Sequence, residues 1–409
     1  MKIFGAHEPQ TLAQLRDVAE RAERAALMAD GHLGYVMPIG GVAAYRNKVS
    51  VVGVGFDIAC GNAAIRTDRT LADLGGTDQQ RRTALTGLAD EIQNALSFGI
   101  GRKNRADDAP VDHPLFEDPE WSAAPARYRQ ALKDKARGQL GTVGSGNHYV
   151  DLFADEQDGL WVGVHFGSRG FGFGVAYGFL ALSQGMEWHA RAPEREVLLE
   201  LDRPMGHDYW ALMTLAGRYA YAGREWVARK VVSILGAREM DLVHNHHNFA
   251  WRETHEGESL IVVRKGATPA FPGQRGFVGG SMGDDAVIVQ GTVVDERRAP
   301  EIARTQRAAL FSTVHGAGRI MSRTQAAGKR NRRTGAVIRP GQISREMMHA
   351  WVKRKNVVLR GGGTDESPHV YRRLPEVLAA QEGTVEVLHT LRPLVVVMAG
   401  EDELDPYKD

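Results

Sequence analysis

Residues that can bind a metal ion recur beside glycine-rich turns, where predicted strands of this sequence end. They are Asp57, Cys60, His148, His165, His246, His247 and His315. Taken singly, each histidine is better explained as a packing or capping residue, and Cys60 as a small buried side chain. Together, a carboxylate, a thiolate and several imidazoles form a mixed ligand set that suits Zn, Mn, Co or Fe better than Ca or Mg. More than four candidates indicate two metal ions, an arrangement used in phosphoryl transfer.

Three glycine-rich turns are candidate phosphate-binding loops, at residues 167–170, 279–283 and 316–319. Exposed backbone N–H groups in such turns can bind anionic oxygens, and Arg169 and Arg319 could add charged contacts. For each loop alone, an ordinary tight turn is an equally good explanation. The sequence contains neither a Gly-x-x-x-x-Gly-Lys-[Ser/Thr] loop nor a Lys-x-Asp-Gly motif. If a nucleotide is attached covalently, the nucleophile must therefore be another residue, such as a neutral histidine.

The elements that position these residues are predicted to form one large domain of mixed α/β class, with a sheet core, flanking helices and a metal-lined cleft. Valine-rich runs typical of interior strands lie at residues 51–56, 160–164, 260–263, 286–289 and 394–397. A long helical pattern covers about 207–235, and Leu12, Leu15 and Val18 indicate an early surface helix. Residues 102–125, rich in Pro and Asp, are the best candidate for a long surface loop.

Composition agrees with a globular protein that needs no disulfide to fold. The 409 residues are 43% hydrophobic and 25% charged, and Cys60 is the only cysteine. No apolar run is long enough to span a membrane and no signal peptide is evident, so we expect a cytoplasmic protein. The net charge of +1 means that any binding of nucleic acid must use a local basic surface.

In combination, these motifs resemble the RtcB family of RNA ligases from about Asp30 to about Gly400. The stretches that carry the resemblance are 30–35, 38–40, 53–61, 141–148, 165–170, 247–248, 264–267, 280–283, 312–323 and 391–393. The twelve residues of 312–323 are the most specific of them. The resemblance implies a single ligase domain over residues 1–409, with 401–409 as a C-terminal extension.

The resemblance also implies roles for individual residues. His315 matches the histidine that becomes guanylylated, and Asp30 matches another active-site carboxylate. The positions that match ligands of two Mn²⁺ ions are Asp57, Cys60, His148, His165 and His247. The positions that match the GTP site are Asn147, His148, Asp151, His247, Asn248, Gly279, Gly280, Ser281, Met282, Ala286, His315, Gly316, Ala317 and Gly318. The implied reaction joins an RNA 3′-phosphate, or a 2′,3′-cyclic phosphate after opening, to a 5′-hydroxyl, in RNA repair or tRNA splicing.

The chain departs from the family pattern mainly at the implied nucleotide site. Asp151 replaces a glutamate, Ala286 replaces a serine, and Ala399 replaces the lysine of a terminal Lys-Gly. Phe166 stands where a small polar residue is common, and Lys408 in the tail is the candidate substitute for the lost lysine. Loss of one charged contact would weaken GTP binding by about 1.5–3 kcal/mol without abolishing the chemistry.

Two other functions remain open at this point. One is a metal-dependent phosphoesterase or cyclic phosphodiesterase acting on RNA ends, and the other is a non-catalytic RNA-binding or nucleotide-binding protein with structural metals. The basic run of Lys329, Arg330, Arg332 and Arg333 is a candidate RNA contact, or equally a solvated loop. The sequence identifies neither the natural RNA nor the native metal, and leaves open a need for an archease-like activator. The resemblance favours a monomer.

Overall fold

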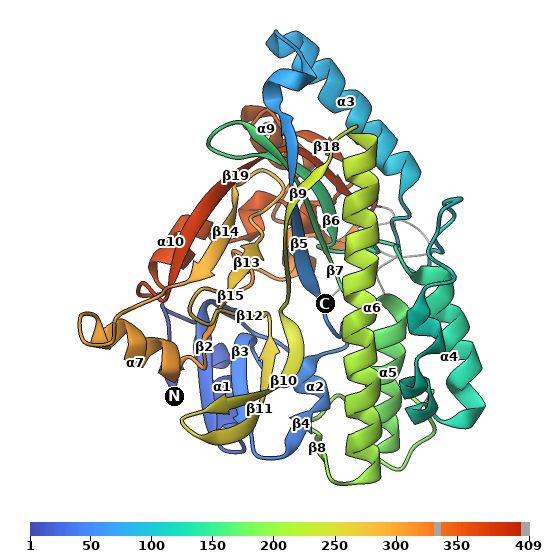
Figure 1. Ribbon diagram of the computed structural model, residues 1–409, viewed down its shortest axis with the longest axis vertical. Helices are drawn as coiled ribbons and strands as arrows, with labels where there is room; N and C mark the ends of the chain where they lie inside the picture. The colour runs from blue at the N-terminus through green and yellow to red at the C-terminus, as the bar shows by residue number, and fades with distance from the viewer. Residues whose placement is uncertain (331–336, 402–409) are drawn as a thin grey trace.

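The computed structural model describes residues 1–330 and 337–401, and it has a mixed α/β architecture built on two main sheets. The larger sheet has eight strands and the smaller has five, and the two lie one above the other in Figure 1. In the smaller sheet the strand order is β1 (Lys2–Ile3), β2 (Arg24–His32), β3 (Ile39–Tyr45), β11 (Glu258–Lys265) and β10 (Asn248–His255).

The larger sheet curves so that its two ends approach each other. Its order is β13 (Arg275–Val278), β14 (Ala286–Gly291), β19 (Val385–Met398), β6 (Tyr149–Ala154), β7 (Gly159–Phe166), β5 (Gly61–Thr70) and β9 (Glu239–His246), with β18 (Val358–Arg360) paired to β19. Across the two ends, the backbone N–H of Phe277 donates to Asn245 Oδ1, and Asn62 Nδ2 donates to the Phe277 carbonyl. The sheet is therefore close to a closed barrel, and the ends of its strands can converge on one cavity.

Among the described residues, three small strand pairs lie outside the two main sheets. They are β4 (Lys48–Ser50) with β8 (Leu198–Glu200), β12 (Ala267–Pro269) with β15 (Ser312–Val314), and β16 (Gly328–Arg330) with β17 (Val337–Pro340). Lys329 and Arg330 of the predicted basic run lie on β16, whereas Arg332 and Arg333 lie outside the described residues. Lys408 also lies outside them.

Helices cover one side of the sheets. The long helix α6 (Pro204–Ile234) contacts β5 and β7, and α4 (Ala126–Gln139) and α5 (Arg169–Leu182) pack beside it, as Figure 1 shows. The other α-helices are α1 (Pro9–Ala19), α2 (Val51–Val54), α3 (Asp78–Ala95), α7 (Pro300–Ala308), α8 (Arg323–Ala327), α9 (Arg345–Arg354) and α10 (Leu374–Ala379). Short 3-10 helices lie at Leu71–Leu74, Pro114–Glu117, Pro119–Ala123, Thr364–Glu366 and Pro368–Val370. Apolar side chains of α5 and α6 share a buried core with α2 and the five-stranded sheet.

Most sequence-predicted elements are confirmed, with one exception. The runs at 160–164, 260–263, 286–289 and 394–397 lie in β7, β11, β14 and β19, and the pattern at 207–235 is α6. The prediction of a strand at 51–56 is wrong, because residues Val51–Val54 form the short helix α2. The Ser50 hydroxyl caps this helix by accepting from the Gly53 N–H, and Gly55 ends it with φ 95°. Full burial explains why this helix is as valine-rich as an interior strand.

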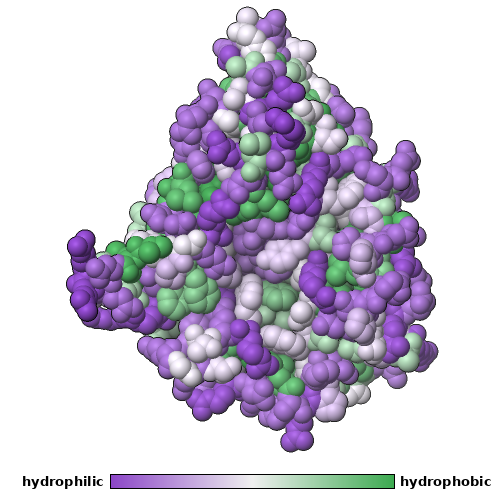
Figure 2. Space-filling view, in the orientation of Figure 1, coloured by the Kyte–Doolittle hydropathy of each residue, from purple (hydrophilic) through white to green (hydrophobic). Residues whose placement is uncertain are grey.

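The segment 102–125 is only partly the surface loop that its composition predicts. It holds two of the 3-10 helices, and the rings of Phe116 and Trp121 are buried in the core against α5 and α6. Within the described residues, no helix is both long and apolar enough to cross a membrane. The face of the molecule in Figure 2 is mainly hydrophilic, with apolar residues in small separate patches.

Candidate active site

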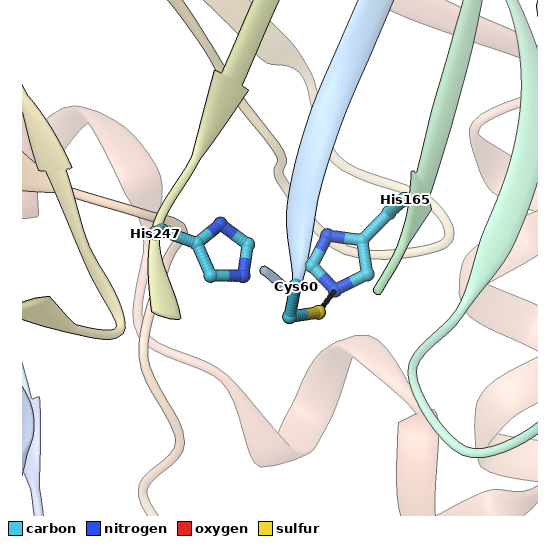
Figure 3. Close-up of side chains that lie close together, drawn as sticks. All are labelled: Cys60, His165 and His247. Carbon is cyan, nitrogen blue, oxygen red and sulfur yellow. Dashed lines mark hydrogen bonds between the residues drawn. The ribbon is translucent and has the colours of Figure 1, made fainter. Parts of the chain in front are cut away.

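Strand register brings the predicted metal ligands together. In the larger sheet, Asn62 pairs with His165 across β5 and β7, and Gly61 pairs with His246 across β5 and β9. Cys60 directly precedes β5, so its thiol lies between the strand that carries His165 and the strand that leads to His247. His247 itself lies between β9 and β10, where the chain passes from the larger sheet to the smaller one. Figure 3 shows the three side chains pointing toward one another from these neighbouring strands.

The ligand atoms form two groups that share one thiol. Cys60, His165 and His247 make one group, and Asp57, Cys60 and His148 make the other, with all candidate ligand atoms within 4.8 Å of one another in each. The Cys60 Sγ lies 3.4 Å from His165 Nε2 and 3.7 Å from His148 Nε2, and the latter nitrogen lies 3.1 Å from Asp57 Oδ2. A shared thiolate between two sets of imidazole and carboxylate donors fits two metal ions with a common ligand.

The histidine rings are oriented by contacts at their opposite nitrogens. His165 Nδ1 lies 2.6 Å from Asn62 Oδ1, and His148 Nδ1 lies 2.9 Å from the Val143 carbonyl. A proton held at Nδ1 leaves the Nε2 lone pair free for a metal, which is the usual arrangement around metal-binding histidines. For His247, the buried Nδ1 has no hydrogen-bond partner among the described residues, as expected for a nitrogen that awaits a ligand.

The ionisation of these groups is strongly shifted. Burial and the neighbouring Asp57 charge raise the pKa of the Cys60 thiol, whereas burial lowers the pKa of His165 and of His247. Burial also opposes ionisation of Asp57, but the hydrogen bond and charge of His148 outweigh it and lower the Asp57 pKa to about 2. The lowered pKa values favour neutral imidazoles at His165 and His247, the form that coordinates a metal, and a bound metal would stabilise the thiolate.

His315 lies beside this centre and is held by Asp30. The ring centroids of His315 and His247 are 4.9 Å apart, and those of His247 and His165 are 5.1 Å apart. Asp30, fully buried in β2, has its Oδ2 at 2.6 Å from His315 Nδ1 and accepts the backbone N–H of His315 at 3.1 Å. The His315 side chain is 16% exposed. With Nδ1 held by a carboxylate, Nε2 is the nitrogen that can act as a nucleophile.

A cavity of about 300 Å³ joins His315 to the ligand groups and to the predicted nucleotide-binding loops. Its lining includes Asp57, Cys60, His165, His247, His315, Asn147, Asp151, Asn248, Gly279, Gly280, Ser281, Met282, Gly316, Ala317 and Gly318. Gly318 has φ 76°, and a Cβ there would lie 2.3 Å from the Asp30 carbonyl oxygen, so a glycine is needed where this loop passes β2. His148 contacts the centre through Cys60 and Asp57.

Several predicted positions are not part of the cavity lining as far as the chain is described: His148, His246, Ala286 and the turn 167–170, which includes Arg169. Ala286 begins β14 and is buried with Phe153 and Leu391 in the core of the larger sheet. Arg169 has a guanidinium nitrogen 3.0 Å from His148 Nδ1. It therefore contacts the side of the His148 ring that faces away from Cys60 and Asp57. In contrast, Arg319 lines the cavity and pairs with Glu366.

Of the residues that depart from the family pattern, Asp151 lines the cavity beside the predicted nucleotide-binding loops. The Asp151 Oδ1 atom has no hydrogen-bond partner in the described part of the chain, and burial raises the pKa of this carboxyl well above its usual value. Ala399 directly follows Met398, which lines the cavity. Phe166, the last residue of β7, is buried in the core of the larger sheet.

Arg224 is a residue of the site that sequence reasoning missed. Its buried guanidinium extends from α6 and donates to the carbonyls of Ala59 and Phe166, at 2.9 and 2.5 Å. These carbonyls belong to the residues next to Cys60 and His165, so Arg224 fixes the backbone beside two candidate ligands. An arginine within a long helical pattern gives no sequence signal of burial, since its acceptors lie far away in the sequence.

Fold and site together define an α/β protein with a buried cluster of one thiol and several imidazoles, beside a histidine that is held by a carboxylate. The chain matches the family model described as tRNA-splicing ligase RtcB over residues 10–399. It is 32% identical over 395 residues to the RNA-splicing ligase RtcB of Escherichia coli K12, covering 91% of this chain and 89% of that protein. It is 29% identical over 446 residues to the tRNA-splicing ligase RtcB of Archaeoglobus fulgidus, covering 90% and 86%. The chain therefore belongs to the RtcB family.

Proposed function

We propose that this protein is an RNA ligase that joins an RNA 3′-phosphate to a 5′-hydroxyl, with GTP as the source of activation. The observation that carries the proposal is the position of His315, which shares one cavity with both ligand groups and has Nδ1 held by Asp30. A binding protein has no use for a nucleophile beside a metal centre, whereas a nucleotidyl transfer requires one. The relatives named as RNA-splicing or tRNA-splicing ligases support the same function.

The metal ions of this proposal are two Mn²⁺, held by the thiolate, imidazole and carboxylate donors of the two ligand groups. The donor set fits such ions because it is mixed and shares Cys60, and because His247 Nδ1 lacks a partner among the described residues. When bound, the ions neutralise phosphate charge and lower the pKa of an attacking hydroxyl.

The proposed reaction has three steps. His315 Nε2 forms a bond to the α-phosphorus of GTP as the bond to the β-phosphate oxygen breaks and pyrophosphate leaves. Asp30 holds the proton on Nδ1 and balances the positive charge of the modified ring. An oxygen of the RNA 3′-phosphate then attacks the phosphorus on His315, which releases the histidine. Finally the 5′-hydroxyl attacks the activated 3′-phosphate, gives up its proton, and expels GMP.

The cavity supports specific roles for the loops at its other end. Backbone N–H groups of the 279–282 and 316–318 loops are suited to bind phosphate oxygens, and Arg319 adds positive charge. The Ser281 hydroxyl donates to Asp284 at 2.7 Å, so it is already oriented within the wall. Asn248 Oδ1 accepts from the Gly266 N–H at 2.7 Å, which fixes this amide beside His247.

The decisive experiment is incubation of the protein with α-labelled GTP and Mn²⁺. We expect an acid-labile label on the protein, which is lost in His315→Ala and retained in the control His349→Ala, which changes an exposed histidine on α9 that does not line the cavity. A 5′-hydroxyl and a 3′-phosphate RNA should then be joined by the unaltered protein. Hydrolysis of RNA ends without any labelling would instead support a phosphoesterase with the same fold. The departures from the family pattern at Ala286 and Ala399 are the reason to test this alternative.

A further inference from the structure

A second and larger cavity, of about 720 Å³, lies between α4, α5, the segment after α5 and the turn between β2 and β3. Aromatic side chains dominate its wall: Tyr35, Tyr128, Phe173, Tyr177, Trp188 and His189. None of these residues carries a role in the proposed chemistry.

The rings of this cavity, which we call the aromatic groove, are arranged for stacking. Tyr35 is 48% exposed. The Tyr128 ring is nearly parallel to the buried Trp188 ring behind it, with centroids 6.2 Å apart. The hydroxyls of Tyr128 and Tyr177 donate to Glu187 and Glu194, at 3.1 and 2.6 Å, which fixes the orientation of both rings. Fixed aromatic faces that reach solvent are the surfaces on which unpaired bases stack.

The aromatic groove is connected to the active site through Phe56. The Phe56 ring stacks on Tyr177 with centroids 4.3 Å apart and meets Tyr35 edge-on at 5.8 Å. The next residue in the chain is Asp57, a candidate metal ligand that lines the active-site cavity. The turn that carries Tyr35 also joins His32 to Ile39, both of which line that cavity. Phe56 therefore links side chains that line the aromatic groove to a residue that lines the active-site cavity.

Positive charge at the rim of the aromatic groove complements a phosphate backbone. Lys135 on α4 and Arg191 after α5 both line the groove and are exposed. Neither cation forms an ion pair with any described residue, whereas many of the other surface arginines do. The acidic lining residue, Glu194, accepts the hydroxyl of Tyr177.

We propose that the aromatic groove binds the single-stranded part of an RNA whose end enters the active-site cavity. Bases stack on the aromatic rings, and Lys135 and Arg191 contact the phosphates. This inference rests on the proposed function only for the statement that the bound strand is an RNA whose end reacts at His315. The contacts between the aromatic groove and RNA do not depend on that reaction. An acidic peptide would match the two cations but would leave the row of aromatic faces unused.

The test measures the affinity of the full-length protein, with Mn²⁺, for fluorescent single-stranded RNAs of about ten nucleotides. One RNA ends in a 3′-phosphate and the other begins with a 5′-hydroxyl. We expect Tyr35→Ala to weaken binding of at least one RNA by on the order of tenfold, and Tyr35→Phe to bind as the unaltered protein does. We expect Lys135→Ala and Arg191→Ala each to reduce the salt dependence of binding, by about 0.7 in the slope of log Kd against log salt.

The matched control for Arg191→Ala is Arg298→Ala, which removes an exposed arginine near α7, on the opposite side of the molecule from α4 and α5 in Figure 1. Labelling by GTP should be unchanged in all these variants. Equal RNA affinity in the groove variants and the unaltered protein would overturn the proposal, as would an equal loss in the Arg298→Ala control. If no variant, including the unaltered protein, accepts label from GTP, the ligase proposal fails, while a selective loss of RNA affinity still supports the groove.

Discussion

The active-site cavity has two ends. The metal end consists of the two ligand groups and His315, and the nucleotide end consists of Asp151 and the 279–282 loop. The two ends differ in how many of their buried polar groups have hydrogen-bond partners. At the metal end, three of the four histidine rings have a partner at the outer nitrogen: Asn62 for His165, the Val143 carbonyl for His148, and Asp30 for His315. Within the described residues, His247 Nδ1 is the exception. At the nucleotide end, Asp151 Oδ1 and the Tyr149 hydroxyl are buried with no hydrogen-bond partner among the residues described. Polar groups that are fixed in advance suit chemistry, and buried groups without partners suit recognition of a ligand that will supply the missing hydrogen bonds.

This contrast predicts that substitutions at the metal end lower the reaction rate or metal affinity, and that substitutions at the nucleotide end change GTP affinity. The departures from the family pattern at Asp151 and Ala399 lie toward the nucleotide end. The predicted ligands and His315 retain the family residues.

The largest effect is expected at Asp30. In Asp30→Asn, the amide no longer provides the charge that holds the proton on His315 Nδ1, so we expect labelling by GTP to slow by about 10²–10⁴-fold. Single-turnover labelling measures this rate. Manganese content should stay the same because Asp30 belongs to neither ligand group. A rate within a factor of two of the unaltered protein would show that Asp30 does not orient the nucleophile.

An intermediate effect is expected at Arg224. In Arg224→Met, the carbonyls of Ala59 and Phe166 lose their donor, and we expect manganese affinity to fall by about 10–100-fold. Competition with a chelator measures the affinity. Arg229→Met is the matched control, since Arg229 lies on the same helix and pairs with Glu225 and Glu239 near the surface. A folded Arg224→Met protein with unchanged affinity would contradict the positioning role.

The smallest effect is expected at Asp151. Burial raises the pKa of this carboxyl, and its Oδ1 has no hydrogen-bond partner among the described residues, so Asp151→Asn should leave the thermal unfolding midpoint unchanged. We expect KM for GTP to rise by up to about tenfold, because a hydrogen bond from the ligand to this carboxyl contributes about 0.5–1.5 kcal/mol. Steady-state ligation at varied GTP measures KM.

Asp155→Asn should give the opposite result. Asp155 follows the same strand and accepts from the Gly159 N–H and from the Trp161 indole, at 2.8 and 2.9 Å. We therefore expect it to lower the unfolding midpoint and leave KM unchanged. If both variants change KM equally, Asp151 has no specific role in binding GTP.

Much of the fold could be predicted from the sequence because periodicity is a local property. The runs at β7, β11, β14 and β19 and the long helix α6 were identifiable from residues within each element. The error at 51–56 arose because a fully buried short helix and an interior strand both consist of apolar residues, and periodicity cannot separate them over so few positions. The burial of Phe116 and Trp121 in the 102–125 segment was not predicted, because the Pro and Asp residues around them are typical of a surface loop.

By itself, the sequence determined which side chains are available for metal and phosphate chemistry, because residue types and the spacing of glycines are properties of the sequence alone. Only the tertiary structure decided that the imidazoles of His148, His165, His247 and His315 form a continuous row, with successive ring centroids 5.5, 5.1 and 4.9 Å apart. It also decided that Arg224 reaches the backbone beside Cys60, and that Phe56 connects the active-site cavity to the aromatic groove. The physical reason is that strand register and helix packing bring together residues that are far apart in the chain, and no local pattern records those distances.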